Sequence, residues 1–109
     1  MTKVTIYKNA DDVICGFDID GHAGYDDKGY DIVCSAISIL TITAINSIES
    51  FTSDGFKCEA NEDKGTIHFF MEDVPCETSQ IILKSMVLGL DMISNDYGKG
   101  YIRITFKEV

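Results

Sequence analysis

The chain has 109 residues, of which 45% are hydrophobic and 25% are charged, and its formal net charge is −9. This length and this balance predict a single domain, residues 1–109, with enough apolar side chains for a modest core. The negative charge argues against direct binding to nucleic acid, which needs clustered lysine and arginine, and it suits a basic partner or substrate as well as simple solubility.

The first twelve residues, MTKVTIYKNADD, lack the apolar stretch of a secretory signal, and we expect no run that approaches membrane-spanning length. A cytoplasmic protein without membrane contact is therefore expected, with its four cysteines as reduced thiols. The cysteines are widely spaced and form no C-x-x-C pair, which argues against a zinc ribbon or a thioredoxin-type redox site.

Alternating apolar and polar residues predict two strands, 2–8 and 13–20, which the turn NADD joins into a hairpin. The run from Ile32 to Phe51 contains many β-branched residues, as strands do. However, its length and the helical spacing of its apolar residues favour a largely buried helix. Segments 55–60 and 65–73 flank the turn NEDKG and predict a second hairpin.

Pro75 precedes the segment 76–94, whose apolar residues recur on one helical face, and proline suits a helix start. The alternating segment YIRITFK, 101–107, predicts a last strand. The element order is ββαββαβ. The fold class predicted is therefore α+β, with two helices packed on a mostly antiparallel sheet.

The stretch GHAGYDDKGYDIVCSA, residues 21–36, leads into the first predicted helix. Asp31 occupies an N-cap position in this prediction, and Cys34 lies in the first turn, where the positive end of the helix dipole favours the nucleophilic thiolate. His22 is the histidine close to Cys34 in sequence and could remove its proton, whereas His68 lies within an alternating strand.

The segment AGYDDKG between the histidine and the helix has few apolar side chains. We expect a mobile loop that orders when a peptide binds and that brings His22 to Cys34. Each feature also has a plainer interpretation. A helical cysteine is often a small buried hydrophobe, Asp31 is more simply a structural cap, and the glycines serve turns.

Metal binding is a weaker interpretation of the same region. The acidic stretch DIDGHAGYDD does not match the ligand spacing of a calcium-binding EF-hand loop. Zinc at His22 and Cys34 would need two more ligands, and Asp31 is the obvious third. We therefore expect no metal and no other cofactor.

The stretch GHAGYDDKGYDIVCSAIS resembles the ribosomal-processing cysteine proteases called Prp. It has a histidine after a glycine, a flexible spacer, the pattern G-x-D-x-V-C-x-A and a serine, and the resemblance extends along the whole chain. It implies a bacterial cysteine endopeptidase that removes the N-terminal extension of ribosomal protein L27. That extension is a short apolar segment that ends in two aromatic residues.

The resemblance also implies roles for individual residues and a homodimer. Cys34 matches the nucleophile and His22 the general base and acid, while Asp31 and Ser38 match supporting positions. Backbone amides near Cys34 and Ser35, in the first turn, are candidate donors to the oxyanion. The candidates for the loop that contacts substrate are Gly21, Gly24, Tyr25, Gly29 and Tyr30.

A non-catalytic alternative is an acidic adaptor that binds the basic ribosomal protein and uses the loop for contact alone. An adaptor needs no activated cysteine, so it predicts an unreactive Cys34 and an uncut substrate.

Overall fold

The structure is a computed structural model that describes residues 1–21, 28–61, 63–97 and 100–109, with the backbone alone at 28–31. Over these residues it confirms the predicted ββαββαβ order. The elements are β1 (Thr2–Lys8), β2 (Ile14–Asp20), α1 (Lys28–Phe51), β3 (Phe56–Asn61), β4 (Thr66–Met71), α2 (Glu77–Tyr97) and β5 (Ile102–Glu108).

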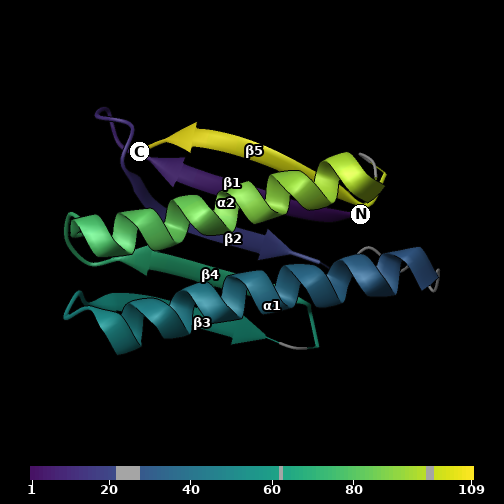
Figure 1. Cartoon of the computed structure of the whole chain (residues 1–109), viewed down its shortest axis with the longest axis horizontal. Helices are drawn as coiled ribbons and strands as arrows, with labels where there is room; N and C mark the ends of the chain where they lie inside the picture. The colour runs from purple at the N-terminus through teal and green to yellow at the C-terminus, as the bar shows by residue number, and fades with distance from the viewer. Residues whose placement is uncertain (22–27, 62, 98–99) are drawn as a thin grey trace.

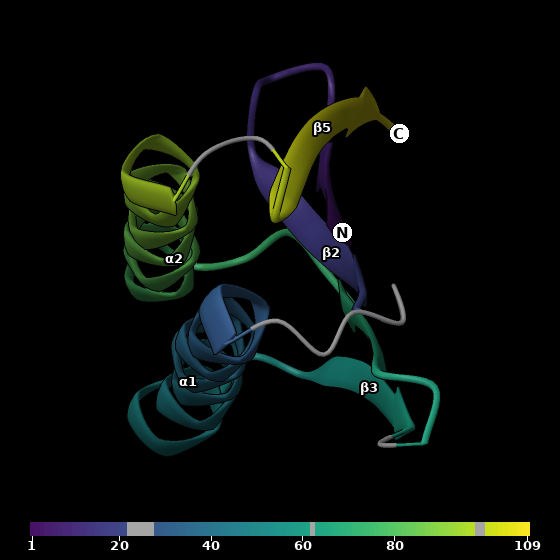
Figure 2. The same cartoon turned by 90° about the vertical axis from the view of Figure 1, so that its right-hand side faces the viewer.

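The strands form one sheet in the order β3-β4-β2-β1-β5. The pairs β1–β2, β2–β4 and β3–β4 are antiparallel, and β1–β5 is parallel, so the predicted mostly antiparallel sheet is confirmed. Both helices lie on one face of the sheet, with α2 over β1, β2 and β5 and α1 over the β3–β4 hairpin (Figures 1 and 2). The result is a two-layer α+β domain.

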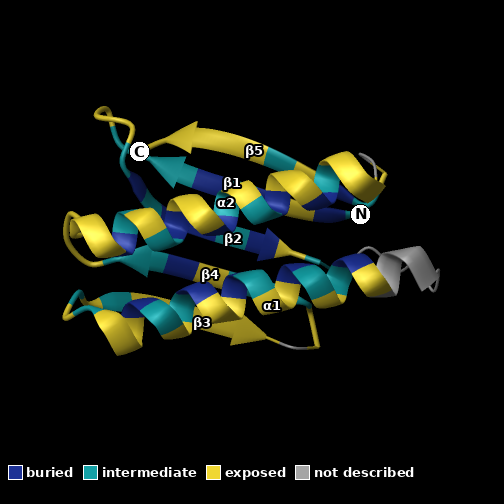
Figure 3. Ribbon diagram, in the orientation of Figure 1, coloured by how far each residue is buried: buried dark blue, intermediate teal, exposed yellow. Residues whose placement is uncertain are grey.

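The core lies between the two layers (Figure 3). Alternation along the strands directs Val4 and Ile6 of β1 and Phe17 of β2 toward the helices, and all three are buried. Burying an apolar side chain of this size contributes about 1.5–3 kcal/mol. The helices meet them with stripes at helical spacing: Val33, Ile37, Thr41, Ala44 and Ile48 on α1, and Ser79, Leu83, Met86, Leu90 and Ile93 on α2.

Helix α1 begins earlier than predicted. It starts at Lys28, so Asp31 is its fourth residue rather than an N-cap, and Cys34 is its seventh, in the second turn. Gly29 and Tyr30, which we expected in the loop, belong to the helix. Aspartates stand both at 27 and at 31, and this residue type is favoured at N-caps. Residue preference therefore does not distinguish the two possible starts.

The expectation that no run approaches membrane-spanning length is also wrong. Residues Ile32–Phe51 have a mean hydropathy of 1.7 and are long and apolar enough to cross a membrane by length and composition. In this fold, some of these apolar residues cover one part of the sheet, and others, such as Ile39 and Phe51, are exposed. The buried stripe of α1 faces the core, which accounts for part of its apolar character.

Candidate active site

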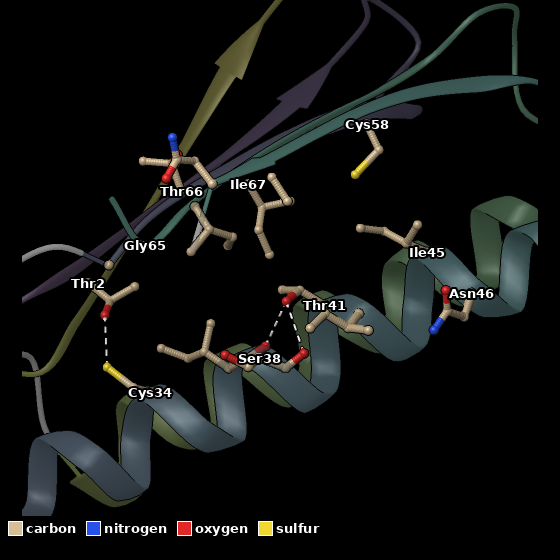
Figure 4. Close-up of a pocket in the computed structure, with 16 residues that line it drawn as sticks. Thr2, Cys34, Ser38, Thr41, Ile45, Asn46, Cys58, Gly65, Thr66 and Ile67 are labelled. Atoms are coloured by element: carbon tan, nitrogen blue, oxygen red, sulfur yellow. Dashed lines mark hydrogen bonds between the residues drawn. The ribbon is translucent and has the colours of Figure 1, made fainter. Parts of the chain in front are cut away.

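A groove of about 550 Å³ lies between α1 and the β3–β4 hairpin, and Cys34 lies at one end of it (Figure 4). The helix contributes residues spaced three or four apart, which places them on one face. The helix wall consists of Cys34, Ile37, Ser38, Thr41, Ile42, Ile45 and Asn46. The opposite wall consists of Thr2, Ile19, Gly21, Cys58, Ala60, Asn61, Gly65, Thr66 and Ile67.

Cys34 is a half-buried free thiol, and its Sγ lies 3.9 Å from Oγ1 of Thr2, within hydrogen-bonding range for sulfur. Ser38 follows one turn later, lines the groove and is exposed. Thr41 is buried, and its hydroxyl donates to the Ile37 carbonyl oxygen over 2.8 Å. The Thr41 hydroxyl thus bonds within its own helix, whereas among the described lining residues Thr2 places a hydroxyl next to the sulfur.

A second free thiol, Cys58, lies on the hairpin wall of the same groove. Its side chain is exposed, yet partial desolvation of the sulfur raises the pKa of the Cys58 thiol. A raised pKa means less thiolate at neutral pH, so Cys58 is a poorer nucleophile than a fully solvated cysteine would be. Among the described residues, no charged side chain lines the groove.

Gly21 directly follows β2, lines the groove and precedes His22 in the sequence. Its N–H donates to the Gly65 carbonyl oxygen over 2.8 Å, and a Cβ at Gly21 would lie 3.2 Å from that oxygen. Gly65 has a φ of 64°, a conformation that favours glycine. The two glycines thus fix where the chain leaves the sheet. His22, Gly24 and Tyr25 lie outside the described residues, as do the side chains of Tyr30 and Asp31.

The early start of α1 changes the expected electrostatics at Cys34. The helix dipole acts mainly within the first turn, so a second-turn cysteine gains less from it. The unpaired backbone amides of a helix are the first four, and Cys34 and Ser35 lie beyond them. The expected first-turn position of these two residues is therefore wrong, whereas the identity of the oxyanion donors stays a prediction.

His68 lies on the side of the sheet that the helices leave uncovered. It is exposed on β4 and contacts Asp18 on β2 through Nδ1. Tyr7 donates to the other oxygen of Asp18 over 2.5 Å, and that hydrogen bond is the main cause of the raised pKa of Tyr7. His68 therefore belongs to a surface cluster away from the groove, and His22 remains the histidine that could serve Cys34.

Within the described part of the chain, no group of three or more histidine, cysteine, aspartate or glutamate side chains is placed to hold a metal ion. Sequence reasoning also missed most of the residues that line the groove, among them Thr2 and Cys58. Thr2 is one polar residue in an alternating strand, and Cys58 is one cysteine in another. Neither pattern carries a signal for a site.

Comparisons with known proteins agree with this geometry. Residues 1–103 match the family model of the cysteine protease Prp. The chain is 29% identical over 107 residues to the ribosomal processing cysteine protease Prp of Staphylococcus aureus, covering 98% of this chain and 100% of that protein. It is 28% identical over 109 residues to the protein of the same name in Bacillus subtilis, covering 96% of each.

Solved structures give the same result. An essential ribosomal processing protease Prp from S. aureus, in complex with a substrate peptide, matches with a TM-score of 0.91 and 28% identity, over 98% of this chain and 100% of that one. Its complex with a covalently linked product peptide matches with a TM-score of 0.87 and 29% identity, with the same coverage. The match over nearly the whole chain shows that this protein belongs to the Prp family of cysteine proteases.

Proposed function

We propose that this protein is a ribosomal processing protease that removes the N-terminal extension of ribosomal protein L27. The observation that carries the proposal is a free thiol, Cys34, at the end of a groove with no charged side chain among its described lining residues. Membership of the Prp family supports a protease rather than a non-catalytic adaptor. The substrate peptide bound to the S. aureus relative supports a peptide as the ligand.

The walls of the groove suit an apolar peptide. Isoleucines at 37, 42 and 45 on the helix face Ala60 and Ile67 on the hairpin. An extended apolar segment would bury its side chains against these residues, gaining about 25 cal/mol for each Å² removed from water. The net charge of −9 would attract the basic body of a ribosomal protein and raise its encounter rate.

Cleavage would follow the cysteine–histidine route. His22 takes the Cys34 proton, the thiolate attacks the peptide carbonyl carbon, and His22 returns the proton to the leaving amine as the C–N bond breaks. Water then hydrolyses the thioester, which releases the extension and restores the thiol. The covalently linked product peptide in the S. aureus relative supports a covalent intermediate at the cysteine.

The direct test is to incubate the protein with a peptide that spans the L27 extension and the start of the mature sequence, and to locate the cut by mass spectrometry. We expect one cut at the end of the apolar segment. Cys34→Ala should reduce the rate by at least about 10³-fold with an unchanged circular dichroism spectrum, because the nucleophile is lost. Cleavage by Cys34→Ala at the wild-type rate would contradict the proposal.

The role of His22 is tested by alkylation. In His22→Ala we expect Cys34 to react more slowly with iodoacetamide near neutral pH, because the group that takes its proton is absent. Cys58 in the same sample serves as the internal control. Equal rates for Cys34 in the two proteins would argue against His22 as its base.

We also propose that the protein is a cytoplasmic homodimer. The four cysteines, all free in the structure, support a reducing compartment. Apolar side chains on the outer faces of both helices support association. These include Ile39 on α1 and Ile81, Leu88 and Met92 on α2, each more than half exposed. Sedimentation would detect a dimer as twice the chain mass of 12.1 kDa.

A further inference from the structure

Thr2 is held rigidly at the start of β1, next to the sulfur end of the groove. Strand β1 lies between β2 and β5 in the sheet. The Thr2 N–H donates to the Tyr101 carbonyl oxygen over 2.9 Å, and Thr2 pairs with Ile102 in the parallel register. The residue is 1% exposed. A buried, β-branched side chain on a central strand keeps its hydroxyl in one place.

That hydroxyl faces the Cys34 sulfur across the groove at 3.9 Å (Figure 4). Among the described residues, Thr2 is the one whose side chain hydrogen-bonds this sulfur. The titratable side chains among the described lining residues are Cys34 itself and Cys58 at the other end. No charged side chain of the described walls therefore competes with the hydroxyl for the sulfur.

A hydroxyl hydrogen bond favours the ionised sulfur over the neutral thiol. A hydrogen bond to an ionised acceptor is roughly twice as strong as one between neutral partners, and it shortens when the charge forms. Cys34 lies in the second turn of α1, where the helix dipole contributes less. A fixed donor on the facing strand is thus a local source of stabilisation for the thiolate.

We infer that Thr2 is a positioning residue for the nucleophile, whose hydroxyl donates to the Cys34 sulfur, stabilises its thiolate and holds the side chain toward the groove. The inference rests on the proposed protease function of Cys34. It assigns a role to the first residue of the first strand, which acts through Cys34.

The test compares Thr2→Val, which keeps the shape and removes the hydroxyl, with Thr2→Ser, which keeps the hydroxyl. The rate of Cys34 alkylation by iodoacetamide is measured from pH 5 to 10 by mass spectrometry of the Cys34 peptide. We expect Thr2→Val to react about three to ten times more slowly at pH 7, with its pH profile displaced upward. Thr2→Ser should stay within about twofold of wild type.

Thr41→Val is the matched control. Thr41 is also a buried threonine of the groove, but its hydroxyl donates to the Ile37 and Ser38 carbonyl oxygens. We expect an unchanged pH profile for Cys34 in this variant. If Thr41→Val displaces the profile as much as Thr2→Val does, the effect is general packing and the inference is overturned.

The inference is also overturned if Cys34 in Thr2→Val is alkylated at the wild-type rate. It is overturned as well if the rate falls by the same factor at every pH, because the pH profile is then not displaced. If circular dichroism shows that Thr2→Val does not fold, Thr2→Ala is compared with Thr2→Ser instead. Equal pH profiles of Cys34 alkylation in these two variants overturn the inference. A wild-type profile in Thr2→Ser beside a displaced one in Thr2→Ala supports it. Alkylation needs no peptide. A wild-type protein that leaves the L27 peptide uncut would therefore refute the proposed function separately, by a different readout.

Discussion

The two helices cover the same face of the sheet, but α2 packs closely over β1 whereas α1 leaves a groove over the β3–β4 hairpin. Under α2, the β1 residues Val4 and Ile6 are at most 1% exposed. Under α1, no described residue of β3 is buried, although β3 carries the same kind of alternating pattern (Figure 3). The same kind of alternating pattern thus gives a packed core over β1 and a groove over β3.

Side-chain size explains the difference. The hairpin presents Cys58 and Ala60 toward α1, and these small side chains do not reach the helix. Opposite them, α1 presents Ile42 and Asn46, both of which are exposed. Close packing needs side chains that fill the space between layers, and here they leave about 550 Å³ unfilled.

The sharpest way to test this contrast is to truncate one apolar side chain in each half. Leu83 on α2 is fully buried, so Leu83→Ala should lower the free energy of unfolding by about 3 kcal/mol, through lost burial and a cavity. Ile42 on the groove wall is 48% exposed, so Ile42→Ala should cost less than about 1 kcal/mol. Urea unfolding followed by circular dichroism measures both.

Equal losses in the two variants would mean that the groove is closed in solution. In that case the open half described here would be packed as tightly as the half under α2.

Filling the groove should affect cleavage more than folding. Ala60 lines the groove and is exposed, so Ala60→Phe places a ring where the peptide would lie. We expect kcat/KM on the L27 peptide to fall about tenfold, equivalent to about 1.4 kcal/mol. Stability should change by no more than about 0.5 kcal/mol.

The adjacent residue provides the control. Glu59 is exposed on the same strand, and because side chains alternate, Glu59→Phe projects from the opposite face. It should leave kcat/KM unchanged. A loss as large as that of Ala60→Phe would place the peptide on the uncovered side of the sheet.

The smallest effect expected concerns the start of α2. Asp54, in the loop after α1, accepts hydrogen bonds from the Cys76 N–H at 2.8 Å and the Ser79 hydroxyl at 2.7 Å. Ser79 is buried, so Ser79→Ala should cost about 1 kcal/mol in urea unfolding. Cleavage by the folded protein should not change, because this contact lies in the packed half.

The same contact predicts a pH dependence. The Cys76 amide and the Ser79 hydroxyl lower the pKa of Asp54 below its usual 3.8. The unfolded chain binds the proton more readily, so this stabilisation is present above pH 3.8 and is lost as pH falls through the lower folded value. Asp54→Asn should show a shallower loss of stability in acid. If the free energy of unfolding of Asp54→Asn falls with decreasing pH as it does in wild type, Asp54 does not contribute to the pH dependence.

The strands, their pairing into hairpins and the two helices could be predicted because alternation and helical spacing are local patterns. The start of α1 could not be fixed, because two aspartates compete as caps. The proximity of Thr2 to Cys34 joins residues 32 positions apart, and no local pattern reports it. The groove depends on how far α1 lies from the hairpin. The pairing of His22 with Cys34 stays a prediction, because His22 lies outside the described residues.

The parallel pairing of β1 with β5 has a consequence for the order of assembly. It joins Thr2 to Ile102, so the residue whose hydroxyl faces the Cys34 sulfur is anchored by a strand about 100 positions later in the chain. Such distant contacts form late in folding because a long loop must close first. A growing chain that has not yet supplied β5 would leave one edge of β1 unpaired. Thr2 would therefore reach its place beside the Cys34 thiol only after β5 has been made and has paired with β1.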